Sequence, residues 1–255
     1  MQELIERTYR PFEELLAREV ANAHARRVLD VGCGSGSTTI AAARAAGVTG
    51  HCTGIDISAP MIAAATARAE GEGTAADFIL ADAQTHTFEP EQFDMIVSRF
   101  GVMFFDDPAQ AFTNLRRAAM ADANMRLIAW RSPAENPFMT TAERAAAPLL
   151  PNLPPRRPGA PGQFAFADSD RVAGILEQSG WRAIDIQPLD VECSFPATEL
   201  ANYFTRLGPL GMTLHEADGP TLTRIIEVVR AAFDPFVHGT EVHFTAACWM
   251  IRAHA

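Results

Sequence analysis

The stretch that decides the fold is VLDVGCGSG (residues 28–36), a short apolar run that ends in closely spaced glycines. Glycines after a strand let the backbone approach a ligand, and the amide groups of the following helix point at that ligand. The spacing is G-x-G-x-G, because the residue three positions after Gly34 is Ser37. It therefore differs from the G-x-G-x-x-G that is typical of dinucleotide-binding folds.

On both sides of this stretch, short apolar runs alternate with helix-prone segments. The pattern predicts strands at 27–31, 53–57, 77–80, 93–97 and 125–130. It predicts helices at 11–22, at 37–46, from the cap Ser58 to about 69, and from Asp107-Pro108 onward. Strands and helices that alternate with short links predict an α/β fold, with a doubly wound parallel sheet.

The composition changes after residue 130. Eight of the 17 prolines fall between 133 and 161, so we expect an irregular insertion, because regular helix is hard to sustain through prolines. Regular structure resumes with a helix capped by Asp168 or Asp170, a strand from 181, helical segments at 197–207 and 221–233, and a final strand at 242–251.

Length and composition bound the function. A chain of 255 residues is expected to form a single decorated domain, 1–255. The formal charge of −10 argues against nucleic acid as a partner, because binding to phosphates needs clustered cations. Every basic residue is arginine, which excludes pyridoxal Schiff bases and a Walker-type phosphate loop.

The chain shows no sign of export or membrane insertion at the sequence level. The N-terminus lacks a secretory apolar region, and no stretch reaches the 18 apolar residues that span a bilayer. The cysteines at 33, 52, 193 and 248 have neither redox nor zinc spacing, so we expect no metal. A cytoplasmic protein is the expectation.

Three acids stand at successive strand ends. Asp30 precedes the glycine turn, where a carboxylate suits an ammonium or sulfonium ligand better than a pyrophosphate, although it can also merely brace the turn. Asp56 can hold both ribose hydroxyls, in NAD and adenosyl ligands alike. Asp82 ends the third strand, where it can meet an adenine edge. Together they predict a nucleoside site at this edge of the sheet.

The runs VLDVGCGSGSTT, GIDIS, LADAQ and FDMIVSRFGVMFF resemble class I S-adenosylmethionine-dependent methyltransferases, with the closest likeness to the ubiquinone/menaquinone-biosynthesis group. The resemblance covers residues 25–131. It implies S-adenosyl-L-methionine as cofactor and a Rossmann-like methyltransferase fold. In that fold a seven-stranded, mostly parallel sheet has an antiparallel last strand between strands five and six, and EVHFTAACWMIRA (residues 241–253) fits that strand.

The resemblance also implies roles for individual residues. Those expected to bind the methionine part of the cofactor are Asp30, Gly32, Cys33, Gly34, Gly36, Ser98, Arg99 and Phe100. Those expected to bind its adenosine part are Asp56, Ile57, Met61, Asp82 and Ala83. Cys33 is common in the family's turn and has no nucleophile role there, and Met61 can equally be an ordinary core residue.

Methyl transfer by in-line displacement depends mainly on orientation, so no fixed catalytic motif is required. If the reaction needs a general base, His238 and His243 are the first candidates, and His86 and His215 are two further candidates. Arg99 can bind an anionic substrate or form a structural ion pair. Residues 1–24 are expected to form a helical leader. A substrate lid of helices and loops is expected at 132–166 and 196–240, and its aromatic residues favour a small aromatic or apolar acceptor.

Two other function classes remain open from the sequence. An NAD(P)-dependent oxidoreductase is disfavoured by the glycine spacing and by Asp30. A non-catalytic protein that binds S-adenosylmethionine on the same fold would share every motif described above. The oligomeric state leaves no signature in the sequence.

Overall fold

The computed structural model describes residues 1–150, 157, 159–214 and 219–255. The chain forms two compact units. The sheet unit comprises Arg10–Arg131, Gly159–Leu189 and Cys248–Ala255. The aromatic unit comprises the described residues of Met1–Tyr9, Ser132–Pro158 and Asp190–Ala247. The segments in which the sequence predicts a lid lie largely in the aromatic unit.

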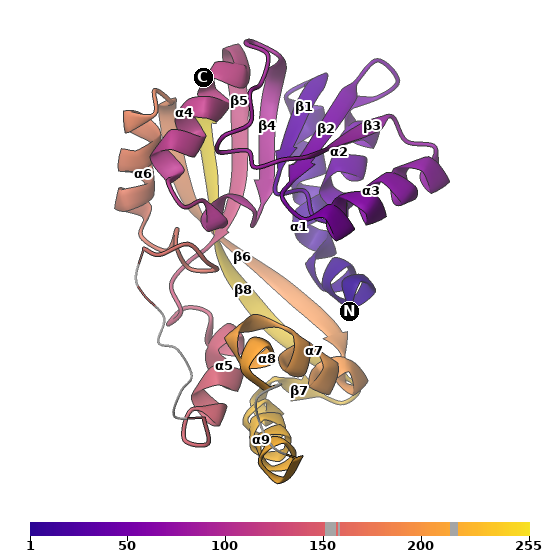
Figure 1. Cartoon of the computed structure of the whole chain (residues 1–255), viewed down its shortest axis with the longest axis vertical. Coiled ribbons are helices and arrows are strands. Elements are labelled where there is room, and N and C mark those ends of the chain that lie inside the picture. Colours follow the sequence, from indigo (N-terminus) through magenta and orange to yellow (C-terminus); the bar gives the residue numbers. More distant parts are fainter. Residues whose placement is uncertain (151–156, 158, 215–218) are drawn as a thin grey trace. The chain divides into compact units, whose positions relative to one another are not determined.

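The sheet has the strand order β3-β2-β1-β4-β5-β8-β6 (Figure 1). The pairs among β1 to β5 are parallel, whereas β8 runs antiparallel to β5 and lies between β5 and β6. This confirms the predicted fold class and its antiparallel last strand. The strand bounds are β1 Arg27–Val31, β2 His51–Asp56, β3 Ala76–Leu80, β4 Phe93–Arg99, β5 Ala119–Trp130, β6 Arg182–Pro196, β7 Val237–His238 (paired with β8) and β8 Glu241–His254.

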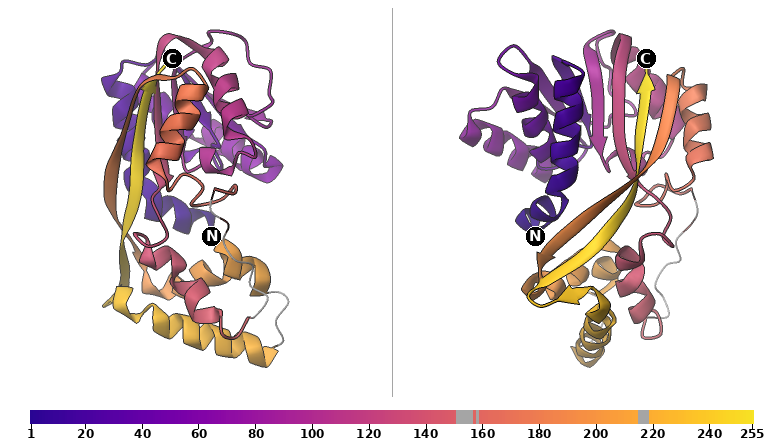
Figure 2. Two further views of the ribbon diagram at one scale, coloured as in Figure 1. Left: turned by 90° about the vertical axis from the view of Figure 1, so that its left-hand side faces the viewer. Right: turned by 180° about the vertical axis from the view of Figure 1, so that it is seen from behind.

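Helices cover both faces of the sheet, with α1 on one face and α4 on the other (Figure 2). The helices are α1 Gln2–Asn22, which begins in the aromatic unit, α2 Ser37–Ala46, α3 Ala59–Glu72, the 3-10 turn η1 Val102–Phe104, α4 Pro108–Ala118 and α6 Ser169–Gln178. Among the described residues, no helix is both long enough and apolar enough to cross a membrane.

Polar side chains start two of these helices as predicted. Asp107 accepts a hydrogen bond from the amide of Gln110 at the start of α4, and Asp168 caps α6 in the same way. Ser58 is the N-cap residue of α3, as predicted, but the side-chain bond expected of a cap is not formed. Its amide donates to Asp56 instead.

The aromatic unit contains α5 Pro137–Ala146, η2 Ala197–Glu199, α7 Leu200–Arg206, α8 Gly208–Thr213, α9 Gly219–Ala232 and η4 Asp234–Phe236. The expectation of an irregular insertion through 133–161 is wrong over α5. Pro137 opens that helix, where a missing amide hydrogen costs nothing. Residues 151–156 and 158 of this insertion, and His215, lie outside the described residues.

Phenylalanine rings form the core of the aromatic unit. Phe138 of α5 lies at the centre, with its ring stacked on that of Phe244 at a centroid distance of 4.0 Å. Other rings within about 6 Å of Phe138 are Phe195 at the end of β6, Tyr203 of α7, Phe233 just before η4, and Phe236 of η4. Aromatic side chains from five elements therefore hold this unit together.

Candidate active site

The three glycines of the turn after β1 have positive φ angles but different surroundings. A Cβ on Gly32 would lie 2.6 Å from the Cα of Gly101, and one on Gly36 would lie 2.9 Å from the ring of Phe78. Gly34, at φ +54°, has no described atom within 4 Å of the Cβ position. Gly32 and Gly36 therefore allow close packing, and Gly34 leaves open space where a ligand can approach the backbone.

Asp56, at the end of β2, holds this turn in place. Its Oδ2 accepts a hydrogen bond from the Gly34 amide at 2.9 Å, and its Oδ1 accepts one from the Ser58 amide at 2.9 Å. Two carboxylate oxygens offer about four acceptor positions, so both oxygens can still accept hydrogen bonds from a ligand. The side chain is half-buried and its orientation is fixed by two backbone groups. This is the geometry that a ribose diol requires.

Asp30 lies beneath the turn and is 1% exposed. Its Oδ2 accepts a hydrogen bond from the Thr39 hydroxyl at 2.7 Å, and its Oδ1 has no hydrogen-bond partner among the described residues. Burial raises the pKa of Asp30 to about 6, although the Thr39 hydrogen bond and the Arg99 charge act in the opposite direction. Asp30 therefore braces α2 and also places a buried negative charge beside the turn.

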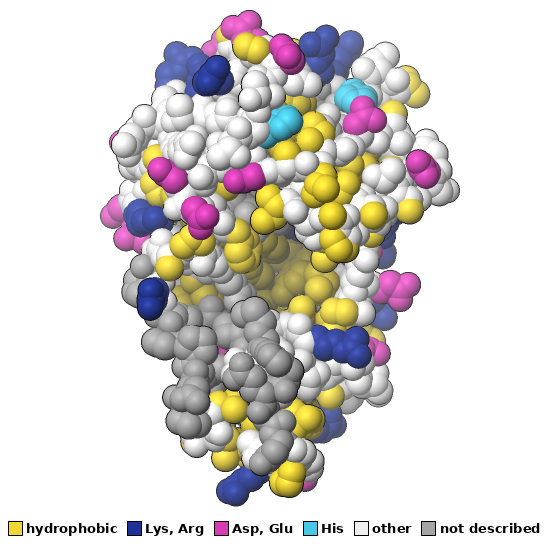
Figure 3. Space-filling model, in the orientation of Figure 1, with side chains coloured by type: hydrophobic (Ala, Val, Ile, Leu, Met, Phe, Trp, Pro, Cys, Tyr) yellow, Lys and Arg dark blue, Asp and Glu magenta, His cyan; other side chains and the backbone are white. Residues whose placement is uncertain are grey.

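Large apolar side chains are exposed at the same edge of the sheet. Ile57 is 73% exposed, Met61 is 42% exposed and Leu80 is 53% exposed. In the register of β2 and β3, Leu80 lies opposite Asp56. Hydrophobic side chains are visible between scattered charges in the space-filling view (Figure 3). A flat apolar ring beside Asp56 would remove these side chains from water.

Leu80 was missed by sequence reasoning, which treated it only as the end of a strand. The available signal was its position two residues before Asp82. Asp82 itself is exposed, and its Oδ1 accepts a hydrogen bond from the Gln84 amide at 2.8 Å. The next residue, Ala83, is buried, and its carbonyl accepts a hydrogen bond from Asn114 of α4 at 3.0 Å. Asn114 therefore anchors the loop that presents Asp82.

A charged cluster surrounds the first turn of α2. The guanidinium of Arg99, at the end of β4, donates to the Ser37 hydroxyl at 3.0 Å. The Glu13 side chain of α1 is also hydrogen-bonded to Ser37, and burial raises its pKa while the charge of Arg99 lowers it. Sequence reasoning predicted Arg99 but missed Glu13, whose only signal was a charge beside the buried face of a helix.

The two neighbours of Arg99 have structural roles. Ser98 is fully buried, its hydroxyl donates to the Val31 carbonyl at 2.6 Å, and its oxygen accepts from the Gly101 amide at 3.1 Å. Phe100 has a left-handed φ of +65°, which costs a non-glycine residue about 1–2 kcal/mol. Its ring stacks on Trp130 at 4.5 Å. A direct contact of either side chain with the cofactor stays a prediction.

The comparison with known proteins decides the family. Residues 28–121, which contain the glycine turn and all three acids, match a family described as "Methyltransferase domain". This segment of the chain is similar to a methyltransferase domain. The sequence predicted that family from the runs VLDVGCGSGSTT, GIDIS, LADAQ and FDMIVSRFGVMFF, and the observed sheet has the antiparallel strand in the position that the resemblance implied.

Relatives and solved structures support this methyltransferase domain. An uncharacterised Mycobacterium tuberculosis protein, Rv1403c, is 30% identical over 154 residues, which cover 59% of this chain and 52% of that one. Aklanonic acid methyltransferase DauC of a Streptomyces species is 36% identical over 108 residues, or 42% and 48% of the two chains. The chain thus spans about half the length of these curated relatives.

A solved structure shares the fold. The YcgJ protein of Bacillus subtilis gives a TM-score of 0.59 at 18% identity and covers 94% of this chain and 97% of its own. The residues present fit S-adenosylmethionine, the cofactor that the sequence resemblance implies. Asp56 matches the ribose, the exposed side chains of Ile57 and Leu80 match the adenine ring, and Gly34 leaves room for the chain of the amino acid.

Three of the predicted site residues, Cys33, His238 and His243, have surroundings that differ from those of the acids at the strand ends. Burial raises the pKa of the Cys33 thiol well above its usual range, which agrees with the absence of a nucleophile role. His238 and His243 belong to the aromatic unit rather than to the methyltransferase domain's glycine turn. Both side chains are exposed, and their rings lie 5.8 Å apart.

The strand pattern explains the exposure of His243. Its neighbours Val242 and Phe244 are buried, and side chains alternate along a strand, so His243 points away from the phenylalanine core. His86, in the sheet unit, packs edge-on against Phe88 at 4.7 Å. The role of any histidine as a base stays a prediction.

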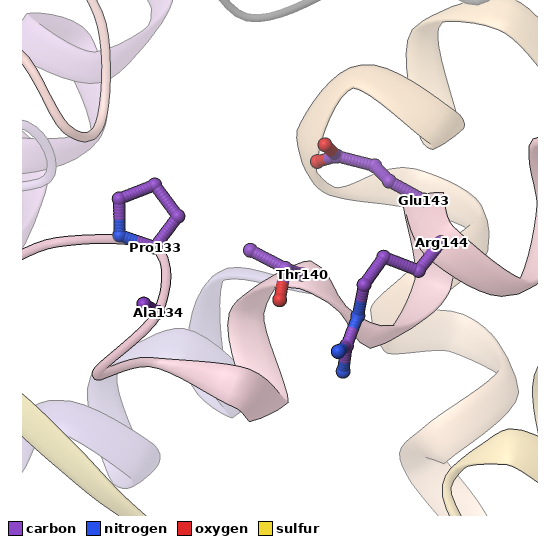
Figure 4. A pocket seen from close by; sticks show the side chains of 5 residues that line it. All are labelled: Pro133, Ala134, Thr140, Glu143 and Arg144. Carbon is purple, nitrogen blue, oxygen red and sulfur yellow. The ribbon is translucent and has the colours of Figure 1, made fainter.

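The aromatic unit also has a surface cavity of about 440 Å³ beside α5 (Figure 4). It is lined by Pro133, Ala134, Thr140, Glu143 and Arg144. Thr140 lies toward the turn that carries Pro133, whereas the side chains of Glu143 and Arg144 point in different directions (Figure 4). None of the residues that the sequence predicted for the site lines this cavity.

Proposed function

We propose that this chain transfers a methyl group from S-adenosylmethionine to a small aromatic or apolar acceptor. The observation that carries the proposal is the Asp56 carboxylate, fixed by the amides of Gly34 and Ser58 beside exposed apolar side chains. This arrangement offers a diol acceptor and an apolar ring surface at one edge of the sheet. An adenosyl group needs both.

The cofactor supplies a methyl group on a positively charged sulfur, which is an activated carbon for in-line displacement. The chain's own residues bind and orient it. Asp56 accepts the ribose hydroxyls, the buried charge of Asp30 favours the cationic end of the ligand, and Arg99 is placed to pair with a carboxylate. Orientation of this kind can supply about 7–11 kcal/mol of the barrier.

The class of acceptor is proposed from two features. The resemblance to ubiquinone/menaquinone-biosynthesis methyltransferases favours a quinone precursor or another aromatic ring. The Streptomyces relative, DauC, is named an aklanonic acid methyltransferase. A net charge of −10 disfavours nucleic acid as the acceptor, and a cytoplasmic location remains a prediction.

A nicotinamide-dependent oxidoreductase is the main competing proposal. A pyrophosphate bound at the glycine turn would carry its charge close to the buried Asp30 carboxylate, which disfavours it. Titration with NADH, followed by its fluorescence, separates the two proposals. We expect no binding of NADH under conditions in which S-adenosylhomocysteine binds.

Two experiments test the proposal. Calorimetry should detect one site for both S-adenosylmethionine and S-adenosylhomocysteine, and failure to detect either ligand defeats the proposal. An isotopically labelled methyl donor, incubated with a panel of aromatic metabolites and analysed by mass spectrometry, should then yield a labelled product. Binding without transfer to any acceptor would favour a non-catalytic protein on the same fold.

A further inference from the structure

The chain turns sharply at Phe100, between the end of β4 and the 3-10 turn η1. Phe100 has a φ of +65°, which lies in the left-handed region. The Cβ of any residue other than glycine is crowded in that region, and a bulky side chain there is a genuine outlier. Contacts around Phe100 must therefore hold its backbone in this conformation.

Aromatic and backbone contacts hold Phe100 in place. Its ring stacks on the ring of Trp130, with centroids 4.5 Å apart and an angle of 10° between the planes. The ring of Phe12 packs edge-on against it at 5.1 Å. The Phe100 amide donates to the Ile128 carbonyl of β5 at 3.0 Å. Because Phe12 and Trp130 are buried, the core of the sheet unit fixes the position of the Phe100 ring.

The turn at Phe100 directs the next residue against the glycine turn that follows β1. A Cβ on Gly101 would lie 2.7 Å from the Cα of Gly32, so the two backbones are in direct contact. The Ser98 hydroxyl joins the same segments, since it donates to the Val31 carbonyl at 2.6 Å and accepts from the Gly101 amide at 3.1 Å. Gly101 therefore supports the glycine turn from the end of β4.

This contact reaches the part of the site where a ligand is expected. Gly32 lies two residues before Gly34, whose Cβ position is open and whose amide donates to Asp56. If the backbone of Phe100 leaves the left-handed region, Gly101 moves and the glycine turn loses its support. A ligand that needs the turn in its present form must then supply the free energy that restores it.

We propose that Phe100 is a positioning residue of the cofactor site. Its ring, held by Trp130 and Phe12, keeps the backbone left-handed, and this keeps Gly101 against Gly32. The proposal requires no contact between the Phe100 side chain and the cofactor. It rests on the proposed function, because the ligand that reports the effect is an adenosyl compound.

Two variants separate the effect of the backbone from that of the ring. Phe100→Ala removes the ring but keeps a Cβ, so the free chain should leave the left-handed region. We expect its dissociation constant for S-adenosylhomocysteine, measured by calorimetry on the full chain, to rise about five- to thirtyfold. Phe100→Gly also removes the ring, but glycine adopts positive φ about as readily as negative φ, so its constant should stay within about threefold of the wild-type value.

Phe100→Asn gives an independent comparison. Asparagine tolerates the left-handed region better than alanine does, although its side chain is larger and polar. Its dissociation constant should therefore fall between those of the glycine and alanine variants. If Phe100→Ala does not fold, as judged by its melting curve, the order of Phe100→Gly and Phe100→Asn decides in its place.

Glu91 provides the matched control. It is exposed, has a left-handed φ of +53°, and lies two residues before β4 begins, at the opposite end of that strand from Phe100. Glu91→Ala and Glu91→Gly repeat the same backbone contrast away from the glycine turn. The two variants should differ in melting temperature, and both should bind S-adenosylhomocysteine as the wild-type chain does.

The outcomes separate the inference from the proposed function. Tighter binding by Phe100→Gly than by Phe100→Ala supports the inference, because ring packing alone predicts that the smaller glycine binds no better than alanine. Equal constants for the two variants, or weaker binding by Phe100→Gly, overturn it. The proposed function survives that result as long as the wild-type chain binds S-adenosylhomocysteine. Failure of the wild-type chain to bind this ligand rejects the proposed function, and the inference with it.

Discussion

The Oδ2 atom of Asp56 accepts a hydrogen bond from the amide of Gly34 at 2.9 Å, so the acid at the end of β2 holds the turn that follows β1. Two motifs that lie 22 residues apart in the sequence thus form one structure. A ligand that binds Asp56 therefore also meets the open space beside Gly34. This coupling underlies the first two predictions.

Replacing Asp56 should weaken cofactor binding. Asp56→Asn retains one acceptor oxygen, whereas Asp56→Ala removes both and frees the Gly34 turn. We expect the dissociation constant for S-adenosylhomocysteine to rise about tenfold for the first variant and up to about a hundredfold for the second, as for charged hydrogen bonds. Calorimetry measures both. Asp77→Asn, at an exposed carboxylate on β3, should leave the affinity unchanged.

Gly34→Ala should weaken S-adenosylhomocysteine binding, whereas its cost in unfolding free energy should match that of a glycine far from the site. Both Gly34 (φ +54°) and Gly73 (φ +60°) have left-handed backbones, and neither has a described atom near the Cβ position. Alanine should therefore cost each about 1–2 kcal/mol of unfolding free energy. Only the methyl group at Gly34 enters the expected ligand space. Equal effects of Gly34→Ala and Gly73→Ala on S-adenosylhomocysteine binding would contradict this interpretation.

Arg99→Gln should discriminate between two adenosyl ligands. S-adenosylhomocysteine carries an aminocarboxylate chain, whereas methylthioadenosine has the adenosyl group without it. If Arg99 pairs with the carboxylate, the variant should lose about tenfold in affinity for the first ligand and little for the second. Asp56→Asn should weaken both. A similar loss for the two ligands in Arg99→Gln would place the guanidinium outside the carboxylate site.

Asp30 should make stability depend on pH. Burial raises its pKa to about 6 from an ordinary value of 3.8, so the folded chain binds the proton more tightly than the unfolded chain. The contribution of Asp30 to the free energy of unfolding is therefore fully present below pH 4. It is lost as the pH rises through 6, and the total loss is about 3 kcal/mol.

Denaturant unfolding of the wild-type chain and of Asp30→Asn, measured between pH 4 and 8, tests this dependence. Asparagine does not titrate, and its amide oxygen can still accept the Thr39 hydrogen bond. The difference in unfolding free energy between the two chains should shift in favour of the variant as the pH rises. Parallel profiles would show that Asp30 has the same pKa in both states.

Local patterns in the sequence were sufficient to predict most of the sheet unit. The helix 37–46 has its predicted bounds, because glycines mark both ends. The pair Asp107-Pro108 likewise marks the start of α4. In contrast, β5 begins at Ala119 rather than 125, since its first residues become a strand only by pairing with other strands.

The insertion after residue 130 shows a different limit. The density of prolines predicted irregular structure, but proline disrupts a helix only beyond its first turn, and Pro137 stands in that first turn. For α5, the position of Pro137 rather than the number of prolines around it decides the local structure.

Some residues of the candidate site could be predicted from the sequence, and others could not. Asp30, Asp56 and Asp82 could be predicted because each lies at or close to the carboxyl end of a strand, and parallel strands bring these ends to one edge. Glu13 and Asn114 could not, because their partners lie 24 or more positions away and are defined only by tertiary packing.

A crystal structure of the chain with S-adenosylhomocysteine bound tests the central claim most directly. The account predicts that both ribose hydroxyls lie within hydrogen-bond distance of the Asp56 carboxylate, with the adenine ring against Ile57 and Leu80. A nucleoside bound elsewhere on the chain, with Asp56 still bonded only to the amides of Gly34 and Ser58, would contradict it.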